Sequence, residues 1–408
     1  MKPLGPIPAG FAALDGELAV GGMTASQLVV QAGGTPLFVY SRAMIEARMA
    51  QLRSAMPADL HIHYAMKANP HPAVLELLAD LVDGLDIASG GELAMAREAG
   101  FLPREISFAG PGKTDAELHA AVKAGVTLNL ESAGEARRAL EAGMTLGTRP
   151  RLAIRVNPSF ELRGSGMKMG GGPKPFGVDQ EQVPALARQI IAAGCDWRGL
   201  HIYTGSQALD AAAVADTQGQ VLDLAAQLTE QIGHPLSHLN LGGGFGIPYF
   251  AKDEPLDLAQ VGAALAARMA ALPDALAGTR LAIELGRYLV GEAGVYLTRV
   301  IDRKESHGTT FLVCDGGMHH QLAASGNFGA VVRRNYPLAI ATRFDAPVEE
   351  NASVVGCLCT PLDRLAEDAA LPRAEEGDLV AVFCAGAYGA SASPAAFLGH
   401  GAAREMLV

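Results

Sequence analysis

Between about residue 60 and residue 287 the sequence alternates eight short β-rich runs with longer helical runs. The β-rich runs are 61–68, 82–89, 105–110, 127–131, 151–157, 198–205, 238–242 and 280–285. The stretches between them are rich in Ala, Leu, Glu and Arg, and several begin with a helix-capping residue such as Thr114 or Ser132. Eight β-then-α units predict a (β/α)8 TIM barrel. The alternative is a doubly wound open sheet, which usually has about six units and an early GxGxxG motif that this chain lacks.

After about residue 288 the sequence becomes β-rich and has little helical character. The β-rich runs here are 294–301, 309–314, 338–343, 353–358 and 379–384. They predict a separate all-β domain. The segments 28–31 and 36–40 are also strand-like, and we expect them to complete this domain. The expected organisation is therefore a barrel at 38–286 inserted into a β domain built from 1–37 and 287–408.

Polar residues and glycines follow six of the eight predicted barrel strands. They lie at 64–69, 86–92, 155–158, 201–207, 242–246 and 284–287. Because the active site of a TIM barrel lies at the C-terminal ends of its strands, we expect these segments to meet at one mouth of the barrel.

The residue types at this mouth point to one kind of chemistry. Lys67 has apolar neighbours, and alone it would be interpreted as an ordinary lysine at a strand end. Together with the residues at the other strand ends, it is predicted to be a Schiff-base lysine. The glycines at 242–244, with Ser206 and Arg287, provide the elements of a phosphate-binding cradle. Glu284 is either an ion-pair partner of Arg287 or a partner for a protonated ring nitrogen. A lysine, a phosphate site and a carboxylate for a ring nitrogen imply pyridoxal 5′-phosphate (PLP).

The same segments resemble motifs of the fold-type III PLP-dependent decarboxylases, the group that holds diaminopimelate, ornithine and arginine decarboxylases. The resemblance runs from about Thr35 to Val408. The matching motifs lie at 64–69, 85–92, 205–207, 242–245, 284–287, 355–359 and 385–389. The resemblance implies an alanine-racemase-like barrel with a C-terminal β domain, and PLP-dependent conversion of an amino acid into an amine and CO2. It also implies a homodimer whose active sites are shared between subunits.

The resemblance further implies a role for each matching residue. Lys67 binds the cofactor covalently, and Glu284 keeps the pyridine nitrogen protonated. Cys359 reaches the active site of the partner subunit and guides or supplies the proton that replaces CO2. The other residues implied at the cofactor are Asp86, Glu92, Arg155, Tyr203, Ser206, Gly243, Gly244, Arg287 and Tyr388. Fold-type III alanine racemases place an arginine at the ring nitrogen, so Glu284 favours decarboxylation over racemisation. A PLP-binding regulator is a further alternative, but single-domain PLP carriers lack the Cys359 segment.

Departures from the motifs concern the substrate. Tyr203 stands where diamino-acid decarboxylases usually have the histidine that stacks on the pyridine ring. Thr360 stands where diaminopimelate decarboxylases have an acid that holds the distal ammonium-bearing centre. Asp363 remains and could meet a distal amine, and we expect Thr360, Asp363 and Phe397 to face the substrate. The glycine-rich loop 165–172 is either a mobile lid over a larger substrate or a simple connection.

Three further segments, 318–320, 327–329 and 397–400, resemble a subgroup found with biosynthetic clusters. The exosortase-associated decarboxylases look closest. Relatives in this subgroup act on siderophore precursors or on amino acids carried by an acyl carrier protein. Our hypothesis is an α-amino-acid substrate whose distal end is conjugated or not basic. The alternative is diaminopimelate decarboxylase itself.

Composition excludes several classes of function. The net charge of −11 leaves no basic excess for binding nucleic acid. We expect no signal peptide and, because no run of about 18 uncharged apolar residues occurs, no membrane span. Five scattered cysteines fit a reducing cytoplasm better than a disulfide framework. His319 and His320 are adjacent and would point to opposite faces of a strand, and no nearby acid pair completes a site, so we expect no metal.

Overall fold

The computed structural model describes residues 1–326 and 334–408, which form two compact units. The barrel unit comprises Met49–Gly246 and Pro255–Leu285, and the β-rich unit comprises Met1–Arg48, Ile247–Glu254 and Gly286–Val408. Among the described residues, no helix is long and apolar enough to cross a membrane.

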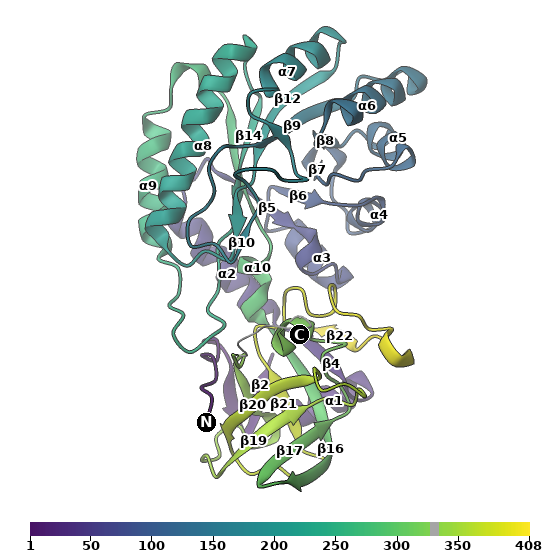
Figure 1. Ribbon diagram of the computed structural model, residues 1–408, viewed down its shortest axis with the longest axis vertical. Coiled ribbons are helices and arrows are strands. Elements are labelled where there is room, and N and C mark those ends of the chain that lie inside the picture. The colour runs from purple at the N-terminus through teal and green to yellow at the C-terminus, as the bar shows by residue number, and fades with distance from the viewer. Residues whose placement is uncertain (327–333) are drawn as a thin grey trace. The chain divides into compact units, whose positions relative to one another are not determined.

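Eight parallel strands close into a barrel in the first unit, which confirms the fold predicted from the eight β-rich runs (Figure 1). The strands are β5 (His61–Ala65), β6 (Gly84–Ile87), β7 (Ile106–Phe108), β8 (Thr127–Leu130), β9 (Arg151–Asn157), β12 (Asp196–Ile202), β14 (His238–Gly243) and β15 (Arg280–Leu285). Their order is β9-β12-β14-β15-β5-β6-β7-β8, and the pairing of β8 with β9 closes the ring. All residues of β6 and nearly all of β9 are buried, as expected for parallel strands covered on both faces.

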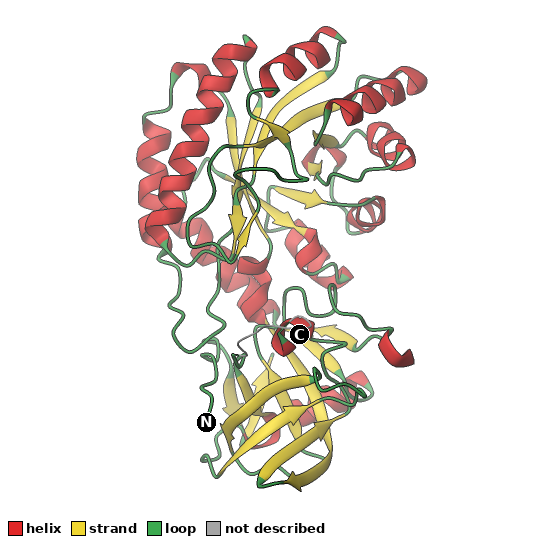
Figure 2. Ribbon diagram, viewed as in Figure 1, coloured by secondary structure: helices red, strands yellow, loops and turns green. Residues whose placement is uncertain are grey.

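Helices surround these strands and connect one to the next (Figure 2). They are α3 (Pro72–Ala79), α4 (Gly90–Glu98), α5 (Asp115–Ala124), α6 (Ala133–Leu146), α7 (Val183–Ala192), α8 (Ala211–Ile232) and α9 (Leu258–Ala270); α2 (Arg42–Ala55) begins in the β-rich unit. Local sequence fixes their ends. Thr114 accepts a hydrogen bond from the backbone N–H of Glu117, whose carboxylate accepts one from the Thr114 N–H in return, and Gly125 ends α5 at a φ of 78°.

The β-rich unit is built around the long strand β16 (Gly294–Ser306). Its other main strands are β17 (Thr309–Cys314), β18 (Leu338–Ile340), β19 (Glu350–Val355), β20 (Arg364–Leu371) and β21 (Leu379–Val382), in the order β18-β21-β16-β17-β19-β20. The N-terminal strand β4 (Leu37–Tyr40) pairs with β16 and with the C-terminal strand β22 (Arg404–Leu407). A small sheet, β1 (Ala12–Leu14), β2 (Glu17–Val20) and β3 (Met23–Thr24), precedes them. The strand expected at 36–40 is therefore present and joins this unit.

The strand expected at 28–31 is wrong, because these residues lie in helix α1 (Ala25–Ala32). Val29 and Val30 have strand propensity, but Thr24 and Gln27 form a capping box and Gly33 ends the helix at a φ of 79°. Leu28 and Val29 are buried in the core of the unit. Capping and the burial of one helix face thus outweigh the weak preference of valine for strands.

Candidate active site

Lys67 lies just beyond the C-terminal end of β5, in the single 3-10 turn Met66–Ala68. It is exposed, and its Nζ lies 5.8 Å from the centre of the Tyr203 ring. Tyr203 directly follows β12, so strands far apart in sequence place an aromatic ring beside the lysine. Glu92 is close enough for the charge of Lys67 to act on it, although burial dominates and raises the pKa of Glu92.

Glu284 is buried near the C-terminal end of β15, where its Oε2 accepts two hydrogen bonds, one from the adjacent strand β14 and one from β12, the strand beyond it. His201 Nε2 on β12 donates at 2.8 Å, and Asn240 Nδ2 on β14 donates at 3.1 Å. Burial alone would raise the pKa of Glu284, but the charge and hydrogen bond of His201 outweigh burial and lower it. The sequence therefore identified the carboxylate but missed the two groups that keep it ionised.

The glycines at the C-terminal end of β14 adopt a conformation that leaves no room for side chains. Gly242 and Gly244 have φ values of 73° and 84°. A Cβ on Gly243 would lie 1.7 Å from the Glu284 carbonyl oxygen, and a Cβ on Gly244 would lie 2.3 Å from the carbonyl oxygen of Gly205. Such a bare, tightly turned backbone is suited to binding an anion such as phosphate.

Ser206 lies in the two-residue strand β13 (Gly205–Ser206). This strand pairs antiparallel with β10 (Met167–Lys168), which belongs to the glycine-rich loop 165–172. The loop is therefore attached by strand pairing to the segment that carries Ser206.

Arg155 is buried on β9 and forms an ion pair with Glu131, at 2.9 Å between Nη1 and Oε1. Glu131 also accepts hydrogen bonds from the backbone N–H groups of Gly110 and Gly177. Burial opposes ionisation of Glu131, but Arg155 and these N–H groups lower its pKa. Glu131 thus links Arg155 to the segments that carry Gly110 and Gly177. Its role was not predicted from the sequence. The predicted contact of Arg155 with the cofactor stays a prediction.

Asp86, at the C-terminal end of β6, accepts a 2.6 Å hydrogen bond from Ser107 Oγ on the adjacent strand. Its other oxygen lies 3.4 Å from Nδ1 of His63. Burial acts to lower the pKa of His63, but Asp86 outweighs burial and raises it. Neither His63 nor Ser107 was predicted to have a role.

Arg287 begins the short helix α10 (Arg287–Val290) of the β-rich unit. Its Nη1 donates a 2.6 Å hydrogen bond to the hydroxyl of Tyr249, and its guanidinium carbon lies 4.9 Å from the centre of the Tyr388 ring. Its Nε is buried and has no hydrogen-bond partner among the described residues. Tyr388 has a φ of 58°, a strained value for a bulky residue that is typical of functional sites. A half-buried cation whose buried Nε has no partner among the described residues is suited to binding an anion.

Cys359, Thr360 and Asp363 lie in the loop between β19 and β20. The Cys359 thiol is exposed. Asp363 is buried, and its two carboxylate oxygens accept backbone hydrogen bonds from Met318 and Leu358 at 2.6 and 2.8 Å. Asp363 therefore fixes the shape of the loop, and its predicted contact with the substrate stays a prediction. Phe397, the third residue expected at the substrate, is exposed.

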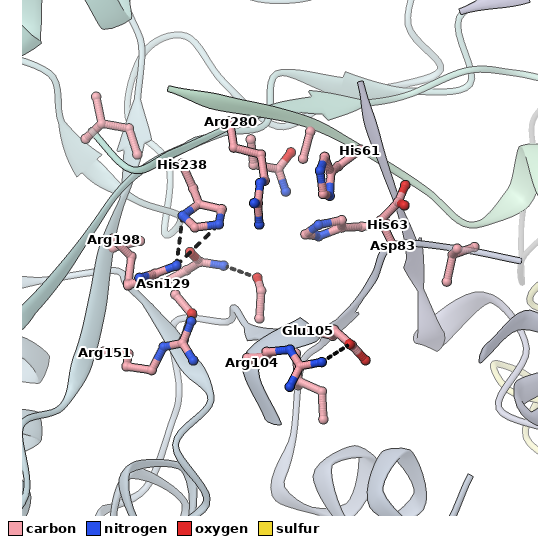
Figure 3. A pocket seen from close by; sticks show the side chains of 18 of the residues that line it. His61, His63, Asp83, Arg104, Glu105, Asn129, Arg151, Arg198, His238 and Arg280 are labelled. Carbon is pink, nitrogen blue, oxygen red and sulfur yellow. Dashed lines mark hydrogen bonds and ion pairs between the residues drawn. The ribbon is translucent and has the colours of Figure 1, made fainter. Parts of the chain in front are cut away.

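A cavity of about 450 Å³ lies at the opposite, N-terminal ends of the barrel strands (Figure 3). Its lining includes four arginines and three histidines: Arg104, Arg151, Arg198, Arg280, His61, His63 and His238. Burial and the nearby arginines lower the pKa of His238 to about 3. This cationic cavity was not predicted from the sequence. Its lining reaches along β5 as far as His63 and includes Asn240, which also donates to Glu284, whereas Lys67 lies beyond the other end of β5 and is not among the lining residues.

Comparison with known proteins identifies the family. Residues 42–291 match the pyridoxal-binding domain of the pyridoxal-dependent decarboxylases. The L-glutamyl-[BtrI acyl-carrier protein] decarboxylase of Niallia circulans is 38% identical over 383 residues, covering 91% of this chain and 88% of that protein. The diaminopimelate decarboxylase of Aquifex aeolicus is 34% identical, covering 92% and 87%. The crystal structure of diaminopimelate decarboxylase from M. jannaschii with L-lysine has a TM-score of 0.86 at 27% identity and covers 98% of this chain and 93% of that chain.

The geometry of each unit fits the cofactor that this family uses. The barrel unit supplies an exposed lysine beside an aromatic ring, a buried ionised carboxylate and a glycine turn that no side chain could enter. The β-rich unit supplies a half-buried arginine, Arg287, whose buried Nε has no partner among the described residues. Since the family match covers most of the chain and its relatives align over nearly all of it, the chain belongs to the fold-type III PLP-dependent amino-acid decarboxylases.

Proposed function

We propose that this enzyme removes the α-carboxylate of an amino acid whose distal end is conjugated, such as a glutamyl group on an acyl carrier protein. The observation that carries the proposal is the similarity, over 91% of the chain, to a decarboxylase named for that kind of substrate. Thr360 agrees with it, because a neutral hydroxyl stands where the resemblance to diaminopimelate decarboxylases predicts an acid for a distal ammonium group. The strand-paired loop 165–172 would give a larger substrate an additional surface next to Ser206.

The residues of the site have separable roles in this proposal. Lys67 would hold the cofactor covalently, and Gly243, Gly244 and Ser206 of the barrel unit would bind its phosphate. The resemblance also assigns Arg287 and Tyr388, of the β-rich unit, to phosphate binding. Tyr203, whose ring lies beside Lys67, would stack on the cofactor ring, and Asp86 and Arg155 would line the pocket around it. When bound, PLP accepts the electron pair that remains on the α-carbon after CO2 leaves.

Glu284 controls the proton at the ring nitrogen. Its pKa is lowered by His201, so it stays an anion and favours a protonated partner at this position. His201 and Asn240 both bind Oε2, which fixes the orientation of the carboxylate before any ligand binds. A carboxylate held in this way would retain a proton on a ring nitrogen more strongly than water would.

The proton that replaces CO2 needs a donor, and Cys359 is the candidate. Its thiol is exposed on its own subunit, which suits a group that completes a site elsewhere. We propose a homodimer in which Cys359 of the partner subunit faces the cofactor. The five cysteines are all unpaired, which supports a cytoplasmic location.

Substrate choice can be tested with purified holoenzyme by measuring CO2 release. The substrates are a glutamyl carrier protein, free L-glutamate and meso-diaminopimelate. We expect kcat/KM for the carrier-bound amino acid to exceed the others by at least about tenfold, which corresponds to about 1.4 kcal/mol of discrimination. Equal or faster release from meso-diaminopimelate would instead identify a diaminopimelate decarboxylase. A Thr360→Glu variant should shift the preference toward meso-diaminopimelate.

The shared site can be tested by mixing two impaired variants, Lys67→Ala and Cys359→Ala. In a random mixture half of the dimers are mixed, and each of these carries one site with both native residues. The mixture should therefore recover about a quarter of native activity. No recovery after subunit exchange, verified by mass spectrometry, would contradict the shared site. Cys195→Ala, at a buried cysteine in the barrel unit, is the control and should keep full activity.

A further inference from the structure

Three side chains that can bind metal ions converge in the β-rich unit. His319 follows β17, Cys357 follows β19, and His400 lies between the 3-10 segment Phe397–Gly399 and β22. Their ligating atoms all lie within 4.8 Å of one another. Cys357 Sγ is 3.9 Å from His400 Nε2, and the rings of His319 and His400 are 4.7 Å apart between centroids.

His319 is the most informative member of this cluster. It is fully buried, yet neither of its ring nitrogens has a hydrogen-bond partner in the described part of the chain. The adjacent His320 is fully accounted for, because its Nδ1 lies 3.0 Å from the Tyr296 hydroxyl and its Nε2 lies 2.9 Å from the Gly401 carbonyl oxygen. Buried polar atoms are nearly always paired, so the nitrogens of His319 call for a partner that no group in residues 1–326 or 334–408 provides.

The donor set defines the class of ion. Two imidazoles and a thiolate favour zinc or a similar borderline-soft ion, whereas calcium and magnesium require oxygen ligands. The nearest carboxylate on the same loop, Asp363, is already occupied by two backbone N–H groups. We propose that His319, Cys357 and His400 bind one zinc-class divalent ion and leave a fourth position to water.

The geometry needs only a modest adjustment. Zinc lies about 2.0–2.3 Å from nitrogen and sulfur ligands, so tetrahedral ligand atoms are about 3.2–3.8 Å apart. The present separations are somewhat larger, and the exposed His400 and half-buried Cys357 lie in loops that can move inward. The buried His319 would be the fixed ligand.

The ion would join three segments that come from different parts of the sequence. One of them is the loop that carries Cys357 and, two residues later, the exposed Cys359. Metal binding at Cys357 would therefore restrict the loop while leaving the Cys359 thiol accessible. The expectation of no metal rested on the adjacency of His319 and His320, but only His319 belongs to the cluster. This proposal does not depend on which amino acid the enzyme decarboxylates.

Zinc stoichiometry tests the site directly. Full-length holoenzyme is stripped with EDTA, incubated with zinc sulfate, desalted and measured by elemental mass spectrometry. We expect about one zinc ion per chain in the wild type and a loss of tenfold or more in affinity for Cys357→Ser and His400→Gln. Cys359→Ser is the matched control, since it removes the neighbouring thiol of the same loop, and it should retain zinc.

Cobalt in place of zinc identifies the ligand. The difference spectrum against metal-free holoenzyme should contain a thiolate-to-cobalt charge-transfer band in the wild type and in Cys359→Ser, but not in Cys357→Ser. Cys357 and His400 are partly exposed, so these variants should fold even if a change at the buried His319 does not. A wild type that retains no zinc would overturn the proposal, as would a Cys357→Ser variant that binds zinc as tightly as the wild type.

Discussion

The hydrogen bond between His201 and Glu284 offers the sharpest test of how the site is held. It joins β12 to β15 across the barrel at 2.8 Å, and both side chains are buried. Replacing His201 with leucine fills the space of the imidazole with an apolar side chain and removes the hydrogen-bond donor. Burial, the largest influence on the pKa of Glu284, would then be opposed by the hydrogen bond from Asn240 and by the charges of Lys67 and Arg155, without the contribution of His201. We expect the Glu284 pKa to rise, in contrast to its lowered value in the wild type.

The cost of this change depends on pH in a way that can be calculated. Loss of a charge-assisted hydrogen bond costs about 1.5–3 kcal/mol. In the variant, Glu284 can become neutral by taking up a proton instead of staying an unpaired buried anion. The free energy of that protonation sets an upper limit on the loss of stability. From its ordinary pKa of 4.5 that proton costs about 3.4 kcal/mol at pH 7 and about 0.8 kcal/mol at pH 5. His201→Leu should therefore destabilise the barrel by about 2–3 kcal/mol at pH 7 and by less than about 1 kcal/mol at pH 5.

Urea unfolding of the cofactor-free chain at the two pH values measures this difference in stability. Without the cofactor, no ring nitrogen exchanges a proton beside Glu284. Trp197 is the single tryptophan and lies in β12, four positions before His201, so its fluorescence reports on the barrel. His201→Gln is the matched control. It also lacks the imidazole but places an amide N–H near the position of Nε2. It should therefore lose less stability and show a weaker pH dependence. A His201→Leu variant equally destabilised at pH 5 and pH 7 would show that His201 does not control the charge of Glu284.

Two further substitutions probe the barrel. Gly243→Ala should reduce PLP retention and destabilise the barrel by about 1–3 kcal/mol, because the new Cβ would clash with the Glu284 carbonyl oxygen. PLP retention is measured by absorbance and stability by unfolding. Gly112→Ala, at a site open to solvent, is the control and should change neither quantity. Lys113→Met removes the cation of a fully buried ion pair 2.8 Å from Glu135 and should cost about 3–5 kcal/mol in tryptophan-monitored unfolding. Replacing both members of this pair with apolar residues should recover most of that loss, and a double variant as unstable as Lys113→Met would contradict the ion-pair explanation.

The barrel could be predicted because its strands repeat a local pattern. Six of the eight β-rich runs end in polar residues and glycines, and the rule that active sites lie at strand C-termini then places Lys67 and Glu284 at one mouth. The rule says nothing about which buried groups touch. His201 is 83 positions from Glu284 in sequence, and only the strand order β12-β14-β15 brings it and Asn240 to the carboxylate. Glu131 was missed for the same reason, since two of its three partners are backbone N–H groups from loops that contain no recognisable motif.

The β-rich unit was harder to predict, because its pairings are mostly non-local and its strands have less regular neighbours. β22 was missed, since it becomes a strand by pairing with β4 at the other end of the chain. The segment 28–31 was assigned from its valines alone, whereas the helix there depends on Thr24 and Gln27 before and within its first turn. Residues 327–329, part of the subgroup resemblance, lie outside the described residues.

The loop between β19 and β20 shows most clearly what spacing alone cannot reveal. Cys357 and Cys359 are too close in sequence for an unstrained disulfide and lack metal-type spacing, so the sequence suggests two unrelated thiols. In the fold they do differ, because Cys359 is exposed while Cys357 lies against two histidines from other segments. Asp363 makes this difference possible by binding the N–H groups of Met318 and Leu358, which brings the His319 loop beside the cysteine loop. Replacing Asp363 with an uncharged residue should therefore change the surroundings of both thiols, Cys357 and Cys359. Replacing either cysteine should leave the surroundings of the other thiol unchanged.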